Sequence, residues 1–262
     1  PPFRACLGIG WKDLRTAVRA IQSLFAAGFL PSALELADAF TLAAARRRTG
    51  SARLAGCQAH FIVELDGHEL GVRREITALS QLLKPLQPLF IDRGFGGAGS
   101  EELWALRRQF SYALRDTGLT KLNEDVVVPR GSLEALFRFA AGLQKKHGIQ
   151  VACFGHAGDG NIHVNLMGDE KDPRQKARSD AALDELFQFI IRVGGSITGE
   201  HGIGLAKTPF LRLQHSPAQI RAMQAVKGAL DPRGVLNPGK MFEVFQVWKH
   251  PRLEVKLPWD HK

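Results

Sequence analysis

The sequence predicts an α+β protein made of two ferredoxin-like β-α-β-β-α-β units, with an antiparallel sheet and helices on one side of it. Residues 125–198 give the order strand, helix, strand, strand, helix, strand. Residues 3–92 give nearly the same order, with one extra helix inserted at about 38–48. The chain has 262 residues, which suits one large domain or two small units fused together.

Hydrophobic periodicity and chain-breaking residues place each element. Apolar residues recur at helical spacing over 14–25 and Gly28 ends that helix, whereas the apolar run 59–65 predicts a strand. Ser132 begins a helix that Gly148 ends. In chain order, the predicted strands cover residues 3–9, 32–36, 59–65, 89–92, 125–128, 150–154, 162–167 and 196–198. The predicted helices cover residues 12–27, 38–47, 69–83, 100–117, 132–147, 173–193 and 217–230.

Composition excludes several classes of protein. A hydrophobic fraction of 45% and a charged fraction of 23% exclude a disordered chain and a collagen. Three cysteines without a C-x-x-C pair exclude a disulfide framework and a cysteine-rich zinc site, and they favour a reducing compartment. The apolar runs are shorter than the ~20 residues of a membrane span. We therefore expect a cytoplasmic protein.

The net charge of +9 favours anionic ligands, anionic partners or a membrane surface, so peripheral attachment at the inner membrane face is an alternative to a freely cytoplasmic protein. The basic residues are scattered, only one tyrosine occurs, and no nucleic-acid-binding motif is present. We expect no nucleic-acid partner. The chain begins Pro-Pro without Met, which predicts a fragment of a longer protein.

The strongest chemical signal is the stretch 155–165 (GHAGDGNIHVN), in which His156 and His163 flank a turn rich in Gly, Asp and Asn. In the predicted unit these histidines face each other across a hairpin, and Glu200 follows the strand that ends at the same edge. Two imidazoles and a carboxylate with open positions suit a catalytic Zn(II), or Fe(II) or Mn(II) in a facial arrangement. Asp159 is a candidate to orient a ligand histidine. The alternative is a hairpin whose histidines are satisfied by backbone carbonyls.

Three further features have two interpretations each. His201 adjoins Glu200 between glycines, so it is either a general base or a residue that caps a turn. Arg107 and Ser111 share one helix face, so they either bind a carboxylate or belong to a solvated basic surface. The run 94–99 (GFGGAG) matches G-x-G-x-x-G, but the strand before it is brief and no parallel βαβ unit follows. We interpret it as a flexible loop.

Several motifs, taken in order, resemble the C-terminal domain of the FAD-linked oxidases, a family that includes glycolate oxidase flavoprotein subunits, D-lactate dehydrogenases and D-2-hydroxyglutarate dehydrogenases. The resemblance covers the chain from its first residue to about Phe242. The motifs are LAD (36–38), LWALR (103–107), DVVVPR (125–130), FGHAGDGNIHVN (154–165), GGSITGEHGIG (194–204) and LDPRGVLNPGKMF (230–242).

The resemblance implies a role for each matching residue. It implies metal binding by His156, His163 and Glu200, and it implies that His201 is the catalytic base. The implied substrate-binding residues are Arg107, Ser111, Lys121 and Asn165. Asn237 resembles a segment that returns to the flavin. The family binds FAD mainly through an N-terminal domain that this sequence lacks, so the resemblance implies an excised substrate or cap domain over 1–245, followed by a tail over 246–262.

The function thus expected is the substrate- and metal-binding domain of a flavin-dependent 2-hydroxy-acid dehydrogenase. Hydride would pass from C2 of a small substrate such as glycolate or D-lactate to FAD, which the missing domain of the same protein would hold. Redox partner subunits are a further expectation. On its own the chain would be inactive. The alternatives are a non-catalytic docking or assembly module of a flavoprotein complex and, less favoured, a stand-alone metal hydrolase.

Overall fold

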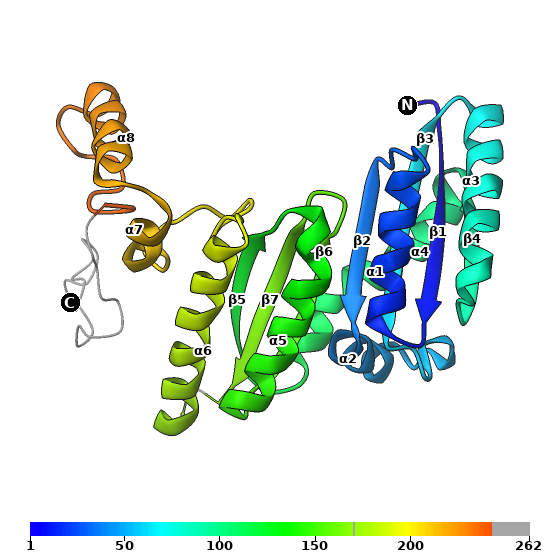
Figure 1. The fold of residues 1–262 in the computed structure, drawn as a ribbon, viewed down its shortest axis with the longest axis horizontal. Coiled ribbons are helices and arrows are strands. Elements are labelled where there is room, and N and C mark those ends of the chain that lie inside the picture. The colour runs from blue at the N-terminus through cyan, green and yellow to red at the C-terminus, as the bar shows by residue number, and fades with distance from the viewer. Residues whose placement is uncertain (170, 243–262) are drawn as a thin grey trace, which may run out of the picture. The chain divides into compact units, whose positions relative to one another are not determined.

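The computed structural model describes residues 1–169 and 171–242 (Figure 1). The chain divides into two compact units, Pro1–Gly199 and Glu200–Lys262, and each is described by itself. The predicted tail and the predicted domain boundary at residue 245 lie outside the described residues.

The first unit is an α+β body with one seven-stranded antiparallel sheet, in the order β4-β1-β3-β2-β6-β7-β5. The first repeat contains β1 (Phe3–Trp11), α1 (Leu14–Ala26), β2 (Ala33–Asp38), β3 (Ala59–Gly67), α3 (Glu69–Leu83) and β4 (Phe90–Phe95). The second contains β5 (Thr120–Val127), α5 (Leu133–His147), β6 (Gln150–His156), β7 (Asn161–Gly168) and α6 (Pro173–Arg192). The predicted duplication of ferredoxin-like units is confirmed.

The last strand of the second repeat is reduced to one antiparallel bridge between Val127 and Ser196. The sequence predicts a short strand over 196–198. The segment leaves the sheet because the carboxylate of Asp125, on β5, accepts hydrogen bonds from the Thr198 hydroxyl and the Gly199 N–H. A side chain therefore replaces the backbone ladder at this point.

The two repeats join through their edge strands β2 and β6. Three residue pairs form this junction, Glu35 with His156, Leu36 with Gly155 and Ala37 with Phe154. Because side chains alternate between the faces of a sheet, Glu35, His156 and Phe154 share one face. The junction therefore brings an acidic residue of the first repeat against a predicted metal ligand of the second.

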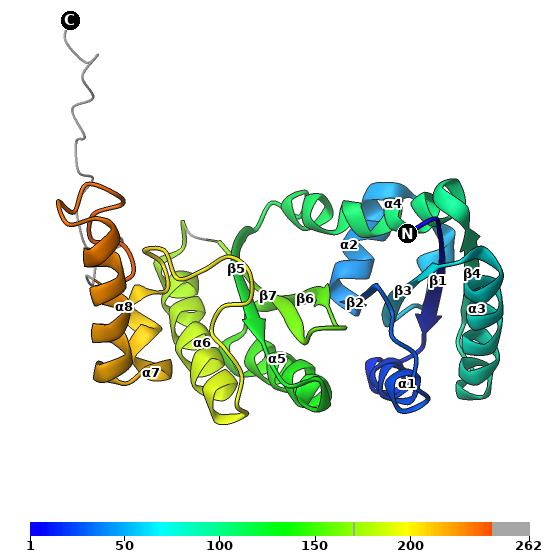
Figure 2. The same ribbon diagram turned by 90° about the horizontal axis from the view of Figure 1, so that it is seen from above.

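Helices cover both faces of the sheet (Figure 2). Helices α1, α3, α5 and α6 lie on one face, as predicted. Two more, α2 (Ala39–Thr49) and α4 (Gly96–Arg115), cover the other face. The sequence predicts both helices, over 38–47 and 100–117, but it places all helices on one side of the sheet. Both pack on the apolar side chains of that face, and a core cluster joins Leu42 of α2 and Phe110 of α4 to Phe154 and Met167. Strands β1, β3, β6 and β7 are mostly buried along their length, so helices must cover both faces of the sheet there.

The glycine run 94–99 is not a loop. Strand β4 extends to Phe95, and α4 begins at the next residue. A Cβ on Gly94 would overlap the backbone carbonyl of Gly99, so glycine is required where the strand end contacts the first turn of the helix. The glycines permit a close backbone approach within a regular strand-to-helix connection.

The second unit contains α7 (Leu211–Gln214) and the predicted helix α8 (Pro217–Leu230). Ser216 and Gln219 form a capping box at the start of α8. Among the helices that the structure describes, none is both long and apolar enough to cross a membrane.

Candidate metal and substrate site

The two histidines of the 155–165 stretch face each other, as the sequence predicts. His156 ends β6 and His163 lies on β7, where it pairs with Phe154. Since Phe154 and His156 are two residues apart, all three side chains lie on the same face. The ring centroids of His156 and His163 are 5.8 Å apart. The tight turn between the strands requires Gly160, whose φ is +78°.

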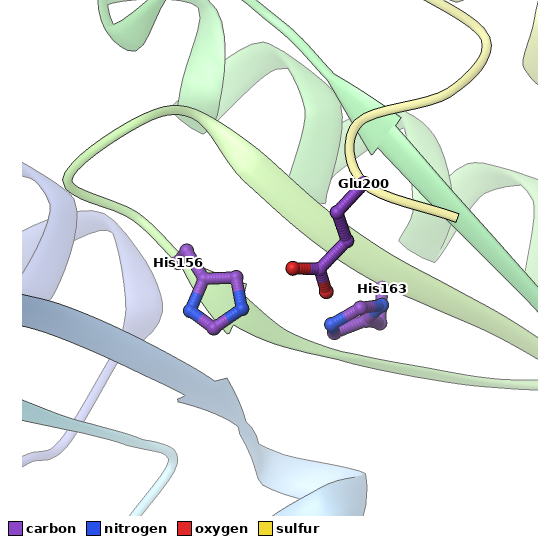
Figure 3. A group of neighbouring side chains, drawn as sticks. All are labelled: His156, His163 and Glu200. Atoms are coloured by element: carbon purple, nitrogen blue, oxygen red, sulfur yellow. The ribbon is translucent and has the colours of Figure 1, made fainter. Parts of the chain in front are cut away.

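Asp125 holds the segment that leads to Glu200 by hydrogen bonds. It is fully buried on β5 directly opposite His163, and its two carboxylate oxygens accept from Thr198 Oγ1 at 3.3 Å and from the Gly199 N–H at 3.0 Å. Glu200 is bonded to Gly199. One ligand atom each from His156, His163 and Glu200 lies within 4.8 Å of the other two, and Figure 3 shows the three side chains turned toward a common space. The donor set fits a divalent cation with positions left for other ligands.

Glu35 orients His156, in place of the predicted Asp159. Its Oε1 contacts His156 Nδ1, while Asp159 contributes a backbone N–H to the His156 carbonyl at 3.1 Å. Glu35 is 5% exposed. Burial by itself raises the pKa of Glu35, but the hydrogen bond with His156 and the positive charge of Arg107 outweigh it, so that the pKa lies below its usual value. The sequence offered one signal for Glu35: it directly precedes the LAD motif (36–38) that carries part of the family resemblance.

Arg107 is mostly buried, which contradicts a solvated basic surface. Its Nε donates to Glu35 Oε2 at 2.6 Å, and 16% of its side chain is exposed. Its guanidinium lies over the ring of Phe154, at 4.9 Å from the centroid, and Phe154 is 5.4 Å from the His163 ring. Arg107 therefore belongs to the same cluster as the histidine pair.

Ser111 and Lys121 contact each other beside that cluster. Lys121 Nζ donates to Ser111 Oγ at 3.1 Å and lies 5.9 Å from the centroid of the Phe154 ring. Burial lowers the pKa of Lys121, and the nearby charge of Arg115 lowers it further. The predicted substrate-binding cations thus both contact Phe154, one from helix α4 and one from strand β5.

Asn165 is fully buried on the same face, two residues beyond His163. Its Nδ2 donates to the carbonyls of Ala152 and His163, at 3.0 and 3.1 Å. Among the described residues, none donates a hydrogen bond to its Oδ1. A buried acceptor without a donor is costly, and a bound molecule with a hydroxyl group would satisfy it.

His201 and Asn237 belong to the second unit. His201 is exposed, with its Nε2 3.8 Å from Glu200 Oε1. Asn237 is exposed in a turn with φ of +46°, and its Oδ1 accepts from Lys240 Nζ at 2.8 Å. The predicted roles of these two residues remain predictions.

The α+β fold and the group of two histidines and a glutamate describe a candidate metal-binding domain, and comparison with known proteins supplies its family. The sequence matches the model of the FAD linked oxidases, C-terminal domain, over residues 1–241. The chain belongs to this family, which confirms the predicted resemblance.

The curated relatives extend beyond this domain. Glycolate oxidase subunit GlcD of Bacillus subtilis is 32% identical over 235 residues, covering 88% of this chain and 49% of that protein. GlcD of Escherichia coli K12 is 30% identical, covering 92% and 48%. A D-lactate dehydrogenase of Anaerostipes hadrus is 28% identical, covering 89% and 51%. The chain thus spans about half the length of the curated relatives it matches.

Solved structures share the fold at low sequence identity. The 4-ethylphenol oxidase of Gulosibacter chungangensis superposes with a TM-score of 0.66 at 17% identity, covering 95% of this chain and 55% of that one. A p-cresol methylhydroxylase gives a TM-score of 0.63 at 16% identity, covering 96% and 54%. These matches support the α+β fold.

Proposed function

We propose that this chain is the substrate- and metal-binding domain of an FAD-dependent dehydrogenase that oxidises a small 2-hydroxy acid such as glycolate or D-lactate. The observation that carries the proposal is the facing pair His156 and His163, which is grouped with Glu200 and lies near Arg107 of helix α4. The names of the relatives, glycolate oxidase subunits and a D-lactate dehydrogenase, support this substrate class.

The residues present fit a divalent cation. Two imidazoles and one carboxylate suit Zn(II), and they also suit Fe(II) or Mn(II). Because Glu35 engages Nδ1 of His156, Nε2 is the ring nitrogen placed to coordinate. A bound cation supplies a Lewis acid that polarises the substrate hydroxyl, and FAD supplies the electron acceptor.

The chain's own residues would hold the acid and move its proton. Within the described residues Arg107 makes a single hydrogen bond, from Nε, so its terminal nitrogens can take a carboxylate in a bidentate grip. Lys121 and Ser111 add a second polar group beside Phe154, and the Oδ1 of Asn165 offers an acceptor for a substrate hydroxyl. His201, exposed beside Glu200, would accept the hydroxyl proton as general base.

The flavin would come from a further domain of the same protein. We assign Asn237, in its turn, a contact with the cofactor. Redox partner subunits would take the electrons onward. A docking module without metal or catalysis is the competing function, and its sign would be a folded chain that binds no metal.

Elemental analysis of the dialysed chain tests the metal site. We expect about one zinc per wild-type chain, and loss of that zinc in His156→Ala and in His163→Ala. His68→Ala, which removes an exposed histidine at the start of α3, is the matched control and should retain zinc. His201→Ala should retain zinc too, while it lowers turnover strongly in the FAD-containing protein. Equal zinc content in all of these variants would contradict the proposed metal centre.

A further inference from the structure

A single buried carboxylate joins the candidate metal ligands to the candidate substrate arginine. We propose that Glu35 is a positioning residue that fixes His156 for the metal and Arg107 for the substrate carboxylate at the same time. This inference rests on the proposed function, and it adds a residue of the first repeat to a site otherwise formed largely by the second.

The junction of the two repeats places Glu35. Its Cα pairs with that of His156 in the short β2–β6 ladder, so both side chains project from the same face at adjacent positions. A slip of one residue in this ladder would turn Glu35 to the opposite face. The register of the junction and the geometry of the site are therefore set together.

The contact with His156 selects one imidazole tautomer. A carboxylate only accepts hydrogen bonds, so the proton of a neutral His156 ring must lie on Nδ1, facing Glu35 Oε1. The lone pair then lies on Nε2, the nitrogen that can coordinate a cation. Carboxylate partners of this kind fix ring orientation and raise the basicity of the ligand nitrogen.

The contact with Arg107 fixes the guanidinium from a second side. Glu35 Oε2 accepts from Arg107 Nε at 2.6 Å, and the rings of Phe154 and Phe110 lie 4.9 and 5.8 Å from the guanidinium carbon. The plane of the guanidinium is thus held by one hydrogen bond and two aromatic rings. Its terminal nitrogens are directed away from the Nε contact.

Two donors require two acceptor oxygens. The carboxylate of Glu35 offers one oxygen to His156 and the other to Arg107. A glutamine of the same shape has one oxygen and one NH₂ group, so it can accept from only one of the two partners and opposes the other. Glu35→Gln should therefore damage metal binding, substrate binding or both without a change in side-chain volume.

The test compares Glu35→Gln with Glu64→Gln in the full chain. Glu64 is a partly buried carboxylate of the neighbouring strand β3, and it contacts Arg4, Cys6 and Trp104 instead of the site. The probes are Zn(II), titrated in competition with a chelator, and glycolate in the presence of zinc. We expect Glu35→Gln to weaken zinc binding about 10- to 100-fold and glycolate binding by up to about tenfold. Glu64→Gln should match wild type in both.

A measurement on the unmodified chain covers the case in which Glu35→Gln does not fold. The ¹⁵N NMR shifts of the metal-free His156 ring at pH 8 should report the tautomer protonated on Nδ1. A ring protonated on Nε2, or a folded Glu35→Gln chain with wild-type affinity for zinc and glycolate, would overturn the inference. If His156→Ala itself retained zinc, the proposed function would fail instead, so the two failures are distinguishable.

Discussion

Acidification should destabilise the fold through His60, a histidine outside the candidate site. His60 lies on β3, is 4% exposed and faces a cavity of about 440 Å³ that Leu103 and Phe90 also line. Burial lowers the pKa of His60 from 6.5 to about 4. The imidazole therefore stays neutral in the folded chain while the unfolded chain binds a proton below pH 6.5.

The sign and size of the effect follow from this difference in pKa. The unfolded state binds more protons between pH 6.5 and 4, so the free energy of unfolding falls as the pH falls through that range. The difference in pKa corresponds to a loss of about 3 kcal/mol in the free energy of unfolding. This loss is complete near pH 4 and absent above pH 7.

Urea unfolding of wild type and His60→Leu at pH 7, 5.5 and 4 measures the effect. Leucine is apolar and similar in size to histidine, so the free energies of unfolding of the two chains should differ by less than about 1.5 kcal/mol at pH 7. Between pH 7 and pH 4, the free energy of unfolding of His60→Leu should rise by about 3 kcal/mol relative to that of wild type. Parallel pH profiles for the two chains would refute the assignment of a buried neutral imidazole.

Two further predictions concern the backbone that carries the site. Gly160→Ala should weaken zinc binding and lower the melting temperature, because Gly160 has a positive φ and a Cβ there would overlap the Val128 carbonyl. Gly142→Ala, in an open position of helix α5, is the control and should stabilise the chain by up to about 1 kcal/mol; equal effects would contradict the strain argument. Asp125→Asn should cost about 1.5–3 kcal/mol in urea unfolding and weaken zinc binding, since one amide oxygen cannot replace two carboxylate oxygens on the segment ending at Gly199. Wild-type zinc affinity would show that Asp125 does not place the ligand segment.

The sequence by itself determined the repeat and the ligand-bearing hairpin. Alternating apolar patterns and glycine or proline breaks are local signals, and they located most strands and helices of both ferredoxin-like units. They missed the first half of β5, which begins at Thr120 and not at residue 125, and they predicted a strand over 196–198 where the structure has a single bridge. The His156–His163 spacing also required only local reasoning, because a short polar turn between two strands must bring the residues that flank it together. Helix spacing left Arg107 with two interpretations, and the family resemblance implied substrate binding for both Arg107 and Lys121. The structure places both beside Phe154.

Only the tertiary structure decided the partners of these residues. Glu35 and His156 are 121 positions apart in the chain, and no local pattern sets the register of the β2–β6 junction that joins them. The same holds for α2 and α4, whose packing on the second sheet face depends on side chains from distant strands. Asp159 looked like the partner of His156 because it is close in sequence, whereas the buried carboxylate that contacts the ring came from the other repeat. Contacts of this kind depend on long-range packing, which periodicity does not encode.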